Sequence, residues 1–232
     1  MMPTGVLVNC ATVLAGSVIG AAVSSRLPKK LTESLPNVFG FAALTIGISL
    51  IINLENLSPV ILALICGTAI GEMLEIEDNL IRGLKKVETK MPGALSKEQM
   101  DHLVNMIVLF CFSGTGIFGA MISGINGDHS ILYTKAIMDF FTAIIFGSTV
   151  GYILALVSIP QFVFGGLLFL ASGTIYPLLT SGMLNDFKAC GGIITLAVGL
   201  KIAGIKKTKV LNMLPALILV FVFSWMWTLI LG

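Results

Sequence analysis

The sequence has little charge. Only 11% of its 232 residues are Asp, Glu, Lys or Arg, whereas soluble domains carry roughly a quarter. With 14 cationic and 12 anionic side chains, the chain cannot cover a water-exposed surface with charge. This shortage excludes a soluble enzyme, a nucleic-acid-binding protein and a disordered linker. The net charge of +2 is also too small to indicate an acidic partner.

Residues that support catalysis or hold metal ions are also scarce. None of the four cysteines is closely paired in sequence, and neither histidine has a second one at metal-ligand spacing. No nucleophile–base arrangement and no phosphate-binding Gly-x-x-x-x-Gly-Lys-Ser/Thr loop is present. We therefore expect no enzyme, no metal and no cofactor. The cysteines, which we interpret as buried packing residues, are Cys10, Cys66, Cys111 and Cys190.

Apolar residues are abundant, at 56% of the chain with a mean hydropathy of +1.00. A membrane-spanning helix needs about 20 mostly apolar residues, and eight runs approach that length. They predict an all-α polytopic membrane protein whose residues 1–232 form a single transmembrane domain. The runs are Gly5–Ser25, Val38–Leu54, Leu57–Leu74, Leu103–Ile125, Ile131–Val157, Phe162–Leu179, Ala189–Ala203 and Met213–Leu231.

Basic residues predict how the chain is oriented in the membrane. Of the 14 cationic side chains, 12 fall within residues 26–30, 82–97 and 201–209. With eight spans these three connections lie on one side, which the positive-inside rule makes cytoplasmic. We therefore expect the N-terminus and the C-terminus on the outer side, with the first run retained as a span.

The longest polar stretch, residues 75–100, predicts an amphipathic helix and loop on the cytoplasmic face. Ile76, Leu80, Leu84 and Val87 recur at helical spacing, with charged residues between them. An alternative is a solvated helix that extends the third span.

A glycine motif recurs late in three predicted spans, as Gly16–Gly20, Gly67–Gly71 and Gly147–Gly151, with a weaker relative near Gly199. Two glycines four residues apart lie on one helix face and let a second helix approach closely. The similar neighbours of these motifs predict an internal repeat of helical hairpins. Repeats of this kind occur in transporters, although they can also serve only to build a stable bundle.

Two ionisable residues stand inside the fifth predicted span. Lys135 and Asp139 are four residues apart, which places them on one helix face within ion-pair reach. Charges inside the membrane are costly and by default indicate function. The pair predicts a charged site facing a cavity, or alternatively a structural ion pair near the outer interface.

Further polar residues complete the predicted binding site. Glycines and hydroxyls at Ser113–Gly116, including Thr115, weaken the fourth span and favour a broken helix that binds a solute. The alternative is a close helix crossing. Asn9 and Lys188 precede small-residue steps by distances similar to that of Asp139, so we expect all three around one cavity.

Several segments along the chain are typical of one known family. They are Gly67–Ile76, Phe110-Cys111, Thr134-Lys135 with Asp139, Gly191–Gly199, Gly204–Lys207 and Leu214–Leu217, of which the closing segment is the most specific. Through them the chain resembles a bacterial inner-membrane family, domain of unknown function 554 (the YdfK/YqgA type). This resemblance implies a multi-span protein of the bacterial inner membrane and favours a transporter, but it supplies no substrate.

Taken together, these features predict a transporter or channel for a small solute or ion. The alternative is a membrane scaffold or regulator that acts through a partner at residues 75–100. The expected partners are membrane lipids and the unknown solute, with no nucleic acid, and a homo-oligomer is possible. The predicted substrate-binding residues are Lys135, Asp139, Ser113, Thr115, Asn9 and Lys188.

Overall fold

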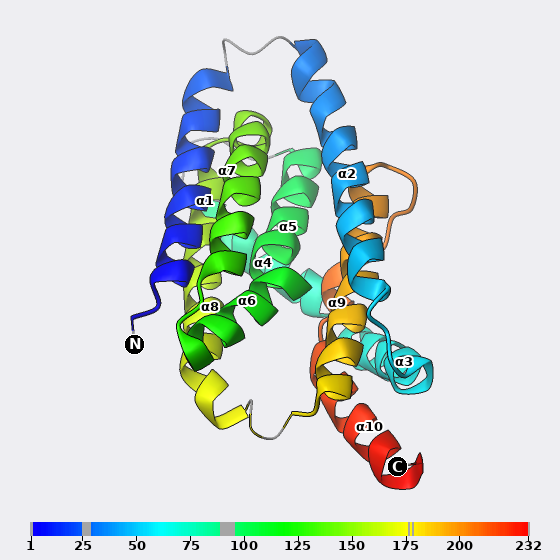
Figure 1. Cartoon of the computed structure of the whole chain (residues 1–232). Coiled ribbons are helices and arrows are strands. Elements are labelled where there is room, and N and C mark those ends of the chain that lie inside the picture. Colours follow the sequence, from blue (N-terminus) through cyan, green and yellow to red (C-terminus); the bar gives the residue numbers. More distant parts are fainter. Residues whose placement is uncertain (1, 25–28, 89–95, 176, 178, 232) are drawn as a thin grey trace.

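The computed structural model describes residues 2–24, 29–88, 96–175, 177 and 179–231, and over these residues the protein contains helices and no strands. This confirms the predicted all-α class (Figure 1). The α-helices are α1 (Thr4–Val23), α2 (Lys29–Ile51), α3 (Leu57–Met73), α4 (Ile76–Glu88), α5 (Lys97–Cys111), α6 (Gly114–Asn126), α7 (Ser130–Val150), α8 (Ser158–Ile175), α9 (Ser181–Ile202) and α10 (Ala216–Leu231). Two 3₁₀ helices, η2 (Tyr152–Val157) and η4 (Val210–Met213), precede α8 and α10.

The predicted count of eight spans is not confirmed. Among the described residues, six helical stretches are long and apolar enough to cross a membrane, or seven if α3 and the start of α4 form one bent span. Those two helices meet at a bend of 46°. Within the described residues, the second predicted span, Val38–Leu54, is represented by the apolar stretch Gly40–Ile51 of α2, which is too short to be counted as a spanning helix.

Several helix ends differ from the predicted spans. The fifth predicted span ends early, at Val150, because Gly151 adopts a positive φ of 90° that few other residues tolerate. The seventh begins early, at Ser181, where the Thr180 hydroxyl accepts a hydrogen bond from the Met183 amide and caps α9. The sixth likewise begins at Ser158 rather than Phe162.

The fourth predicted span is broken, as the Ser113–Gly116 sequence indicates. Helix α5 ends at Cys111 and α6 begins at Gly114. Between them, the Ser113 hydroxyl accepts a hydrogen bond from the Gly116 amide at 3.1 Å, which caps the new helix. The hydroxyl at this position therefore supports a helix start, and the chain changes direction inside the bundle.

The glycine motifs lie at helix crossings. Gly16 and Gly20 of α1 face the backbone of α7 at Phe140 and Ile144, and Gly147 of α7 faces Ser17 of α1. The matched positions increase together along both chains, so α1 and α7 are parallel. A side chain at Gly20 would collide with the Ile144 carbonyl. The small residues thus allow the backbone contact that membrane helices use for packing.

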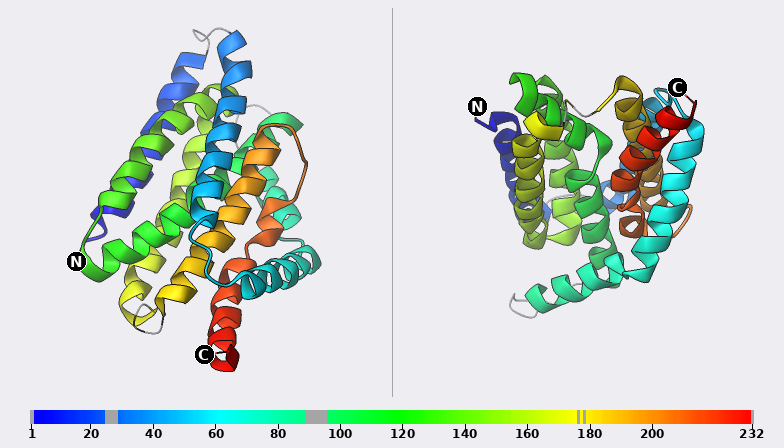
Figure 2. Two further views of the ribbon diagram at one scale, coloured as in Figure 1. Left: turned by 45° about the vertical axis from the view of Figure 1, so that its right-hand side comes forward. Right: turned by 90° about the horizontal axis from the view of Figure 1, so that it is seen from below.

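Two further helix pairs use glycine in the same way. Gly47 and Gly199 lie between antiparallel helices α2 and α9, and Gly67 and Gly71 of α3 face Ala216 and Asn212. Helices α1, α6, α7 and α8 pack together, as do α2, α3, α9 and α10. Helix α5 packs against α7, α8 and α9, between the two groups. Seen from below, α1 with α8 and α3 with α10 lie at opposite sides (Figure 2).

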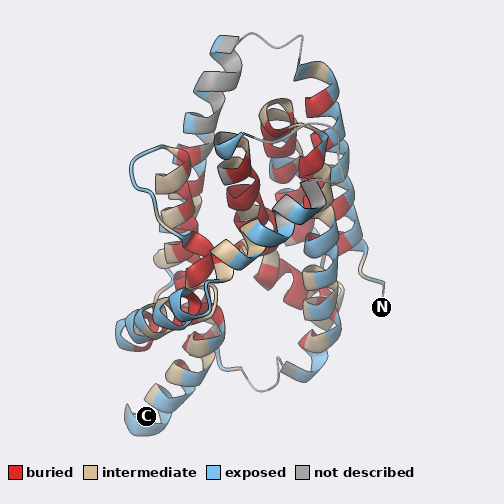
Figure 3. Cartoon of the chain, turned by 180° about the vertical axis from the view of Figure 1, so that it is seen from behind, coloured by how far each residue is buried: buried red, intermediate tan, exposed pale blue. Residues whose placement is uncertain are grey.

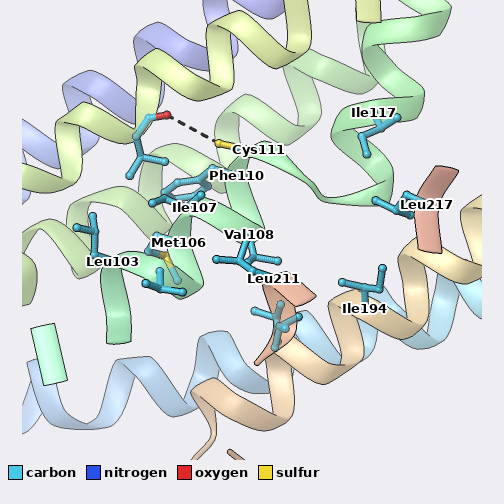
Figure 4. Close-up of a cluster of buried hydrophobic side chains, with 14 of the residues drawn as sticks. Leu103, Met106, Ile107, Val108, Phe110, Cys111, Ile117, Ile194, Leu211 and Leu217 are labelled. Atoms are coloured by element: carbon cyan, nitrogen blue, oxygen red, sulfur yellow. Dashed lines mark hydrogen bonds between the residues drawn. The ribbon is translucent and has the colours of Figure 1, made fainter. Parts of the chain in front are cut away.

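The main hydrophobic core surrounds α5. Leu103, Met106 and Phe110 are fully buried, and Ile194 of α9 and Leu211 of η4 belong to the same cluster (Figure 4). Exposed residues dominate the outer parts of the molecule, including the far end of α10 (Figure 3). Large exposed apolar side chains on the spanning helices are expected where lipid, rather than water, is the solvent.

Helix α4 crosses the bundle and is held by ion pairs. The buried Glu77 carboxylate pairs with Lys201 of α9 at 3.0 Å and also accepts the Leu211 amide. On the exposed side, Asp78 accepts a hydrogen bond from Lys209 at 2.7 Å, which raises the pKa of that ammonium above its usual value. Residues Ile76–Glu88 form a helix within the stretch 75–100, for which a cytoplasmic amphipathic helix is predicted, and residues 89–95 of that stretch lie outside the described residues.

Candidate functional site

A buried ion pair joins Lys135 and Asp139 on one face of α7. The two residues are only 5% and 6% exposed, and Asp139 is the tenth residue of a 21-residue helix. The i to i+4 spacing brings the ammonium onto the carboxylate. A charge pair so far from the helix ends costs desolvation energy, so this position needs an explanation beyond packing.

A chain of side-chain amides extends the pair away from α7. The Asn9 amide of α1 donates to Asp139 Oδ2 at 2.8 Å, and Gln161 of α8 donates to Asn9 Oδ1 at 2.7 Å. Asn9 and Gln161 are each 4% exposed. Four polar residues from three helices thus form one buried network, in which each member orients the next.

The break between α5 and α6 lies against the Lys135 end of the network. Lys135 Nζ donates to the Phe110 carbonyl, close to the end of α5, at 3.4 Å and lies 5.8 Å from the Phe110 ring centre. Gly116, in the first turn of α6, lies against the aliphatic part of Lys135. Because α5 stops at Cys111, its last carbonyls have no helical partner, and one of them accepts from the buried ammonium.

A groove with a volume of about 510 Å³ opens beside the ion pair. Its walls come from α2, α7 and the α5–α6 break, with Thr195 of α9 at the back. The volume lies within the range of small-molecule sites. Most of the lining surface is apolar, and the polar residues that contribute to it are Ser49, Ser113, Thr115, Thr134, Lys135, Asp139, Thr142 and Thr195.

Four of the six predicted site residues line this groove, namely Lys135, Asp139, Ser113 and Thr115. Asn9 touches the site through its hydrogen bond to Asp139, and it lines a separate small cavity. Lys188 does not line the groove. Its ammonium lies over the Phe118 ring at 4.3 Å, next to Asn185 of its own helix. The expected clustering of Asn9, Asp139 and Lys188 therefore holds for the first two only.

Sequence reasoning missed Gln161 and the wall formed by α2. Gln161 directly follows Pro160 and falls between the fifth and sixth predicted spans. In the structure, α8 begins at Ser158 and includes Gln161. Proline is tolerated in the first turn of a helix, and this signal would have placed Gln161 inside α8. The α2 wall, from Ala42 to Ser49, gives no comparable signal because its residues are ordinary span residues.

The buried carboxylates of Asp186 and Glu77 lie outside the groove and have structural partners. Asp186 accepts hydrogen bonds from the Asn56 backbone amide at 2.7 Å and the Ser224 hydroxyl at 2.7 Å, which ties α9 to the start of α3 and to α10. Glu77 ties α4 to α9 and η4. Both groups join helix ends, so we assign them to folding. No cluster of metal-binding side chains occurs among the described residues.

Comparisons with known proteins identify the relatives of this chain. Residues 4–225 match the model of a family described as protein of unknown function (DUF554). The chain is 42% identical to the uncharacterized protein YqgA of Escherichia coli (strain K12), over 98% of both chains. It is 30% identical to the uncharacterized membrane protein YdfK of Bacillus subtilis (strain 168), over 93% of both. No solved structure matches the chain.

Proposed function

The chain belongs to the DUF554 family of membrane proteins, and on that premise we propose that it transports a small solute or ion across the bacterial inner membrane. The observation that carries the proposal is the groove of about 510 Å³ beside the buried Lys135–Asp139 pair. Charged residues inside membrane-spanning helices typically mark solute and ion pathways.

The composition of the groove suits a small solute with polar groups. Lys135 and Asp139 offer one charge of each sign, and Ser113 and Thr115 add hydroxyl groups from the broken helix. A solute or ion that binds to Lys135 or to Asp139 would separate the two side chains. The charge of the other residue would then need a new partner. Transport would then couple solute binding to the state of the ion pair.

The packing supports a mechanism based on movement of helix groups. One wall of the groove comes from α2, which packs on α9, and the opposite wall comes from α7, which packs on α1. Glycine lies at both crossings. Movement of one helix group against the other would open and close the groove, as in transporters that rock around a central site.

The remaining expectations are part of the same proposal. The protein acts as a transporter rather than an enzyme, with lipids and the solute as its partners, and a homo-oligomer remains compatible with its exposed apolar faces.

The scaffold alternative has less support. The apolar residues Ile76, Leu80 and Ile81 of α4 are partly buried against the protein's own core, which leaves less apolar surface for a partner.

Reconstituted transport tests the proposal. Purified protein in liposomes would be exposed to a panel of labelled amino acids, carboxylates, sugars and nucleosides and to Na⁺, K⁺ and pH gradients. We expect the wild type to move at least one of them above the rate of empty liposomes. The Asp139→Asn variant, which keeps the side-chain shape and removes the charge, should lower that rate at least tenfold.

The matched control is Asp128→Asn. Asp128 is exposed at the start of the same helix, and its Oδ1 accepts the Ser130 amide, a role that asparagine retains. This variant should transport at the wild-type rate. Equal rates for Asp139→Asn and wild type, or no movement of any compound by a folded wild-type sample, would refute the proposal.

A further inference from the structure

The Gln161 side chain has one buried polar atom without a partner. Its amide nitrogen donates to Asn9 Oδ1, but its carbonyl oxygen Oε1 accepts no hydrogen bond from any residue that the structure describes. The residue as a whole is only 4% exposed. Buried acceptors in folded proteins are nearly always paired with protein or with an ordered water molecule, so this oxygen indicates a missing donor.

The charge of Asp139 determines which way this oxygen points. The Asp139 carboxylate accepts from Asn9 Nδ2, which turns Asn9 Oδ1 toward Gln161. Gln161 must then present its nitrogen to Asn9 and its oxygen to the opposite side. Exchanging the two ends of either amide would place two donors or two acceptors face to face. The free acceptor is therefore a consequence of the network and not of an arbitrary amide assignment.

The unpaired oxygen belongs to a residue that lines a small cavity. This cavity has a volume of about 20 Å³ and is lined by Asn9, Cys10, Cys111, Gly116 and Gln161 together with apolar side chains. A single water molecule needs about 10–15 Å³ on the same measure. The cavity shares no lining residue with the groove, so the groove meets the network at Lys135 and Asp139, and the cavity meets it at Asn9 and Gln161.

We propose that this cavity is a binding site for one ordered water molecule, which donates a hydrogen bond to Gln161 Oε1. The water completes the chain that runs through Gln161 and Asn9 to Asp139. It lies three hydrogen bonds from that carboxylate, in a cavity separate from the groove. The site follows from hydrogen bonding alone and does not depend on which solute the protein moves.

The charge of Asp139 is balanced within the network. Lys135 of α7 neutralises the carboxylate, and the thiols of Cys10 on α1 and Cys111 on α5 line the small cavity. Helices α2 and α9 contribute only apolar residues and the hydroxyls of Ser49 and Thr195 to the groove. Gln161 and its water are thus the polar continuation of the Asp139 site into α8.

A density map at about 2 Å or better tests the proposal directly. We expect one peak in the cavity, about 2.7–3.2 Å from Gln161 Oε1. The Gln161→Leu variant removes the acceptor and should lose the peak. Ser172→Ala is the matched control, because Ser172 is buried on the same helix and bonds only to the Phe169 carbonyl.

The outcomes separate this proposal from its competitors. An empty cavity in a wild-type map that resolves other buried waters would overturn it, even if the variants fail to fold. A peak at about 2.4 Å with several oxygen ligands would indicate a metal cation and would also overturn it. Both results leave the transport assay unaffected, so the two proposals fail independently.

Discussion

At the scale of single residues, the Lys135–Asp139 pair is both a buried ion pair and part of the groove wall. The ammonium neutralises a carboxylate that would otherwise be buried as an isolated charge, and both groups line the groove. Asn9 adds one hydrogen bond to the carboxylate. Removing one partner leaves the other charge uncompensated, whereas removing both charges leaves a neutral polar site.

The Lys135→Met variant should therefore be less stable than the wild type by about 3 kcal/mol. The double variant Lys135→Met/Asp139→Asn should recover most of that loss, because the introduced asparagine still accepts the hydrogen bond from Asn9 without a buried charge. Unfolding of the three proteins in one detergent measures the difference. A single variant as stable as the wild type would contradict a fully ionised buried pair.

At the scale of helices, the glycine motifs determine which pairs form. Gly20 lies against the Ile144 carbonyl of α7, so α1 and α7 touch through backbone atoms. By contrast, a Cβ at Gly166 of α8 would meet nothing within 4 Å. Glycine is therefore required for close helix contact at position 20 and is not required at position 166.

Alanine at these two positions should have effects of opposite sign. Gly20→Ala should destabilise the protein by about 1–3 kcal/mol, because the added carbon must displace α7. Gly166→Ala should stabilise it by up to about 1 kcal/mol, since alanine favours a helix more than glycine does. Unfolding of both variants in the same detergent gives the comparison, and similar effects of the two would argue against a backbone contact between α1 and α7.

At the scale of the whole molecule, two helix groups meet at the groove with α5 between them. Both chain ends lie toward the lower half of the view in Figure 1, whereas the loop with Lys206 and Lys207 lies in its upper half. This arrangement is compatible with the orientation that the basic residues predict, with the basic loops in the cytoplasm.

Labelling of introduced cysteines tests this orientation. Asn126 and Lys207 are both exposed, in the α6–α7 turn and after α9. In intact cells, a membrane-impermeant maleimide should label Asn126→Cys and leave Lys207→Cys unlabelled, in a background without the four native cysteines. Permeabilised cells should show labelling of both. The reverse pattern would place both termini in the cytoplasm.

The sequence by itself determined the membrane environment, the all-α class and four of the polar residues that line the groove. These follow from local properties, since long apolar runs need a lipid solvent, and a Lys–Asp pair at helical spacing forms within one helix. The hydroxyl and glycines at Ser113–Gly116 likewise break the helix through their own cap.

The tertiary structure alone decided which helices meet. It placed α2 opposite α7 to form the groove, brought Gln161 to Asn9, and left Lys188 over Phe118 instead of beside Asp139. These contacts join residues up to 152 positions apart. Equal depth in a span does not specify the direction in which a side chain points, because that direction depends on how each helix is rotated and crossed by its neighbours.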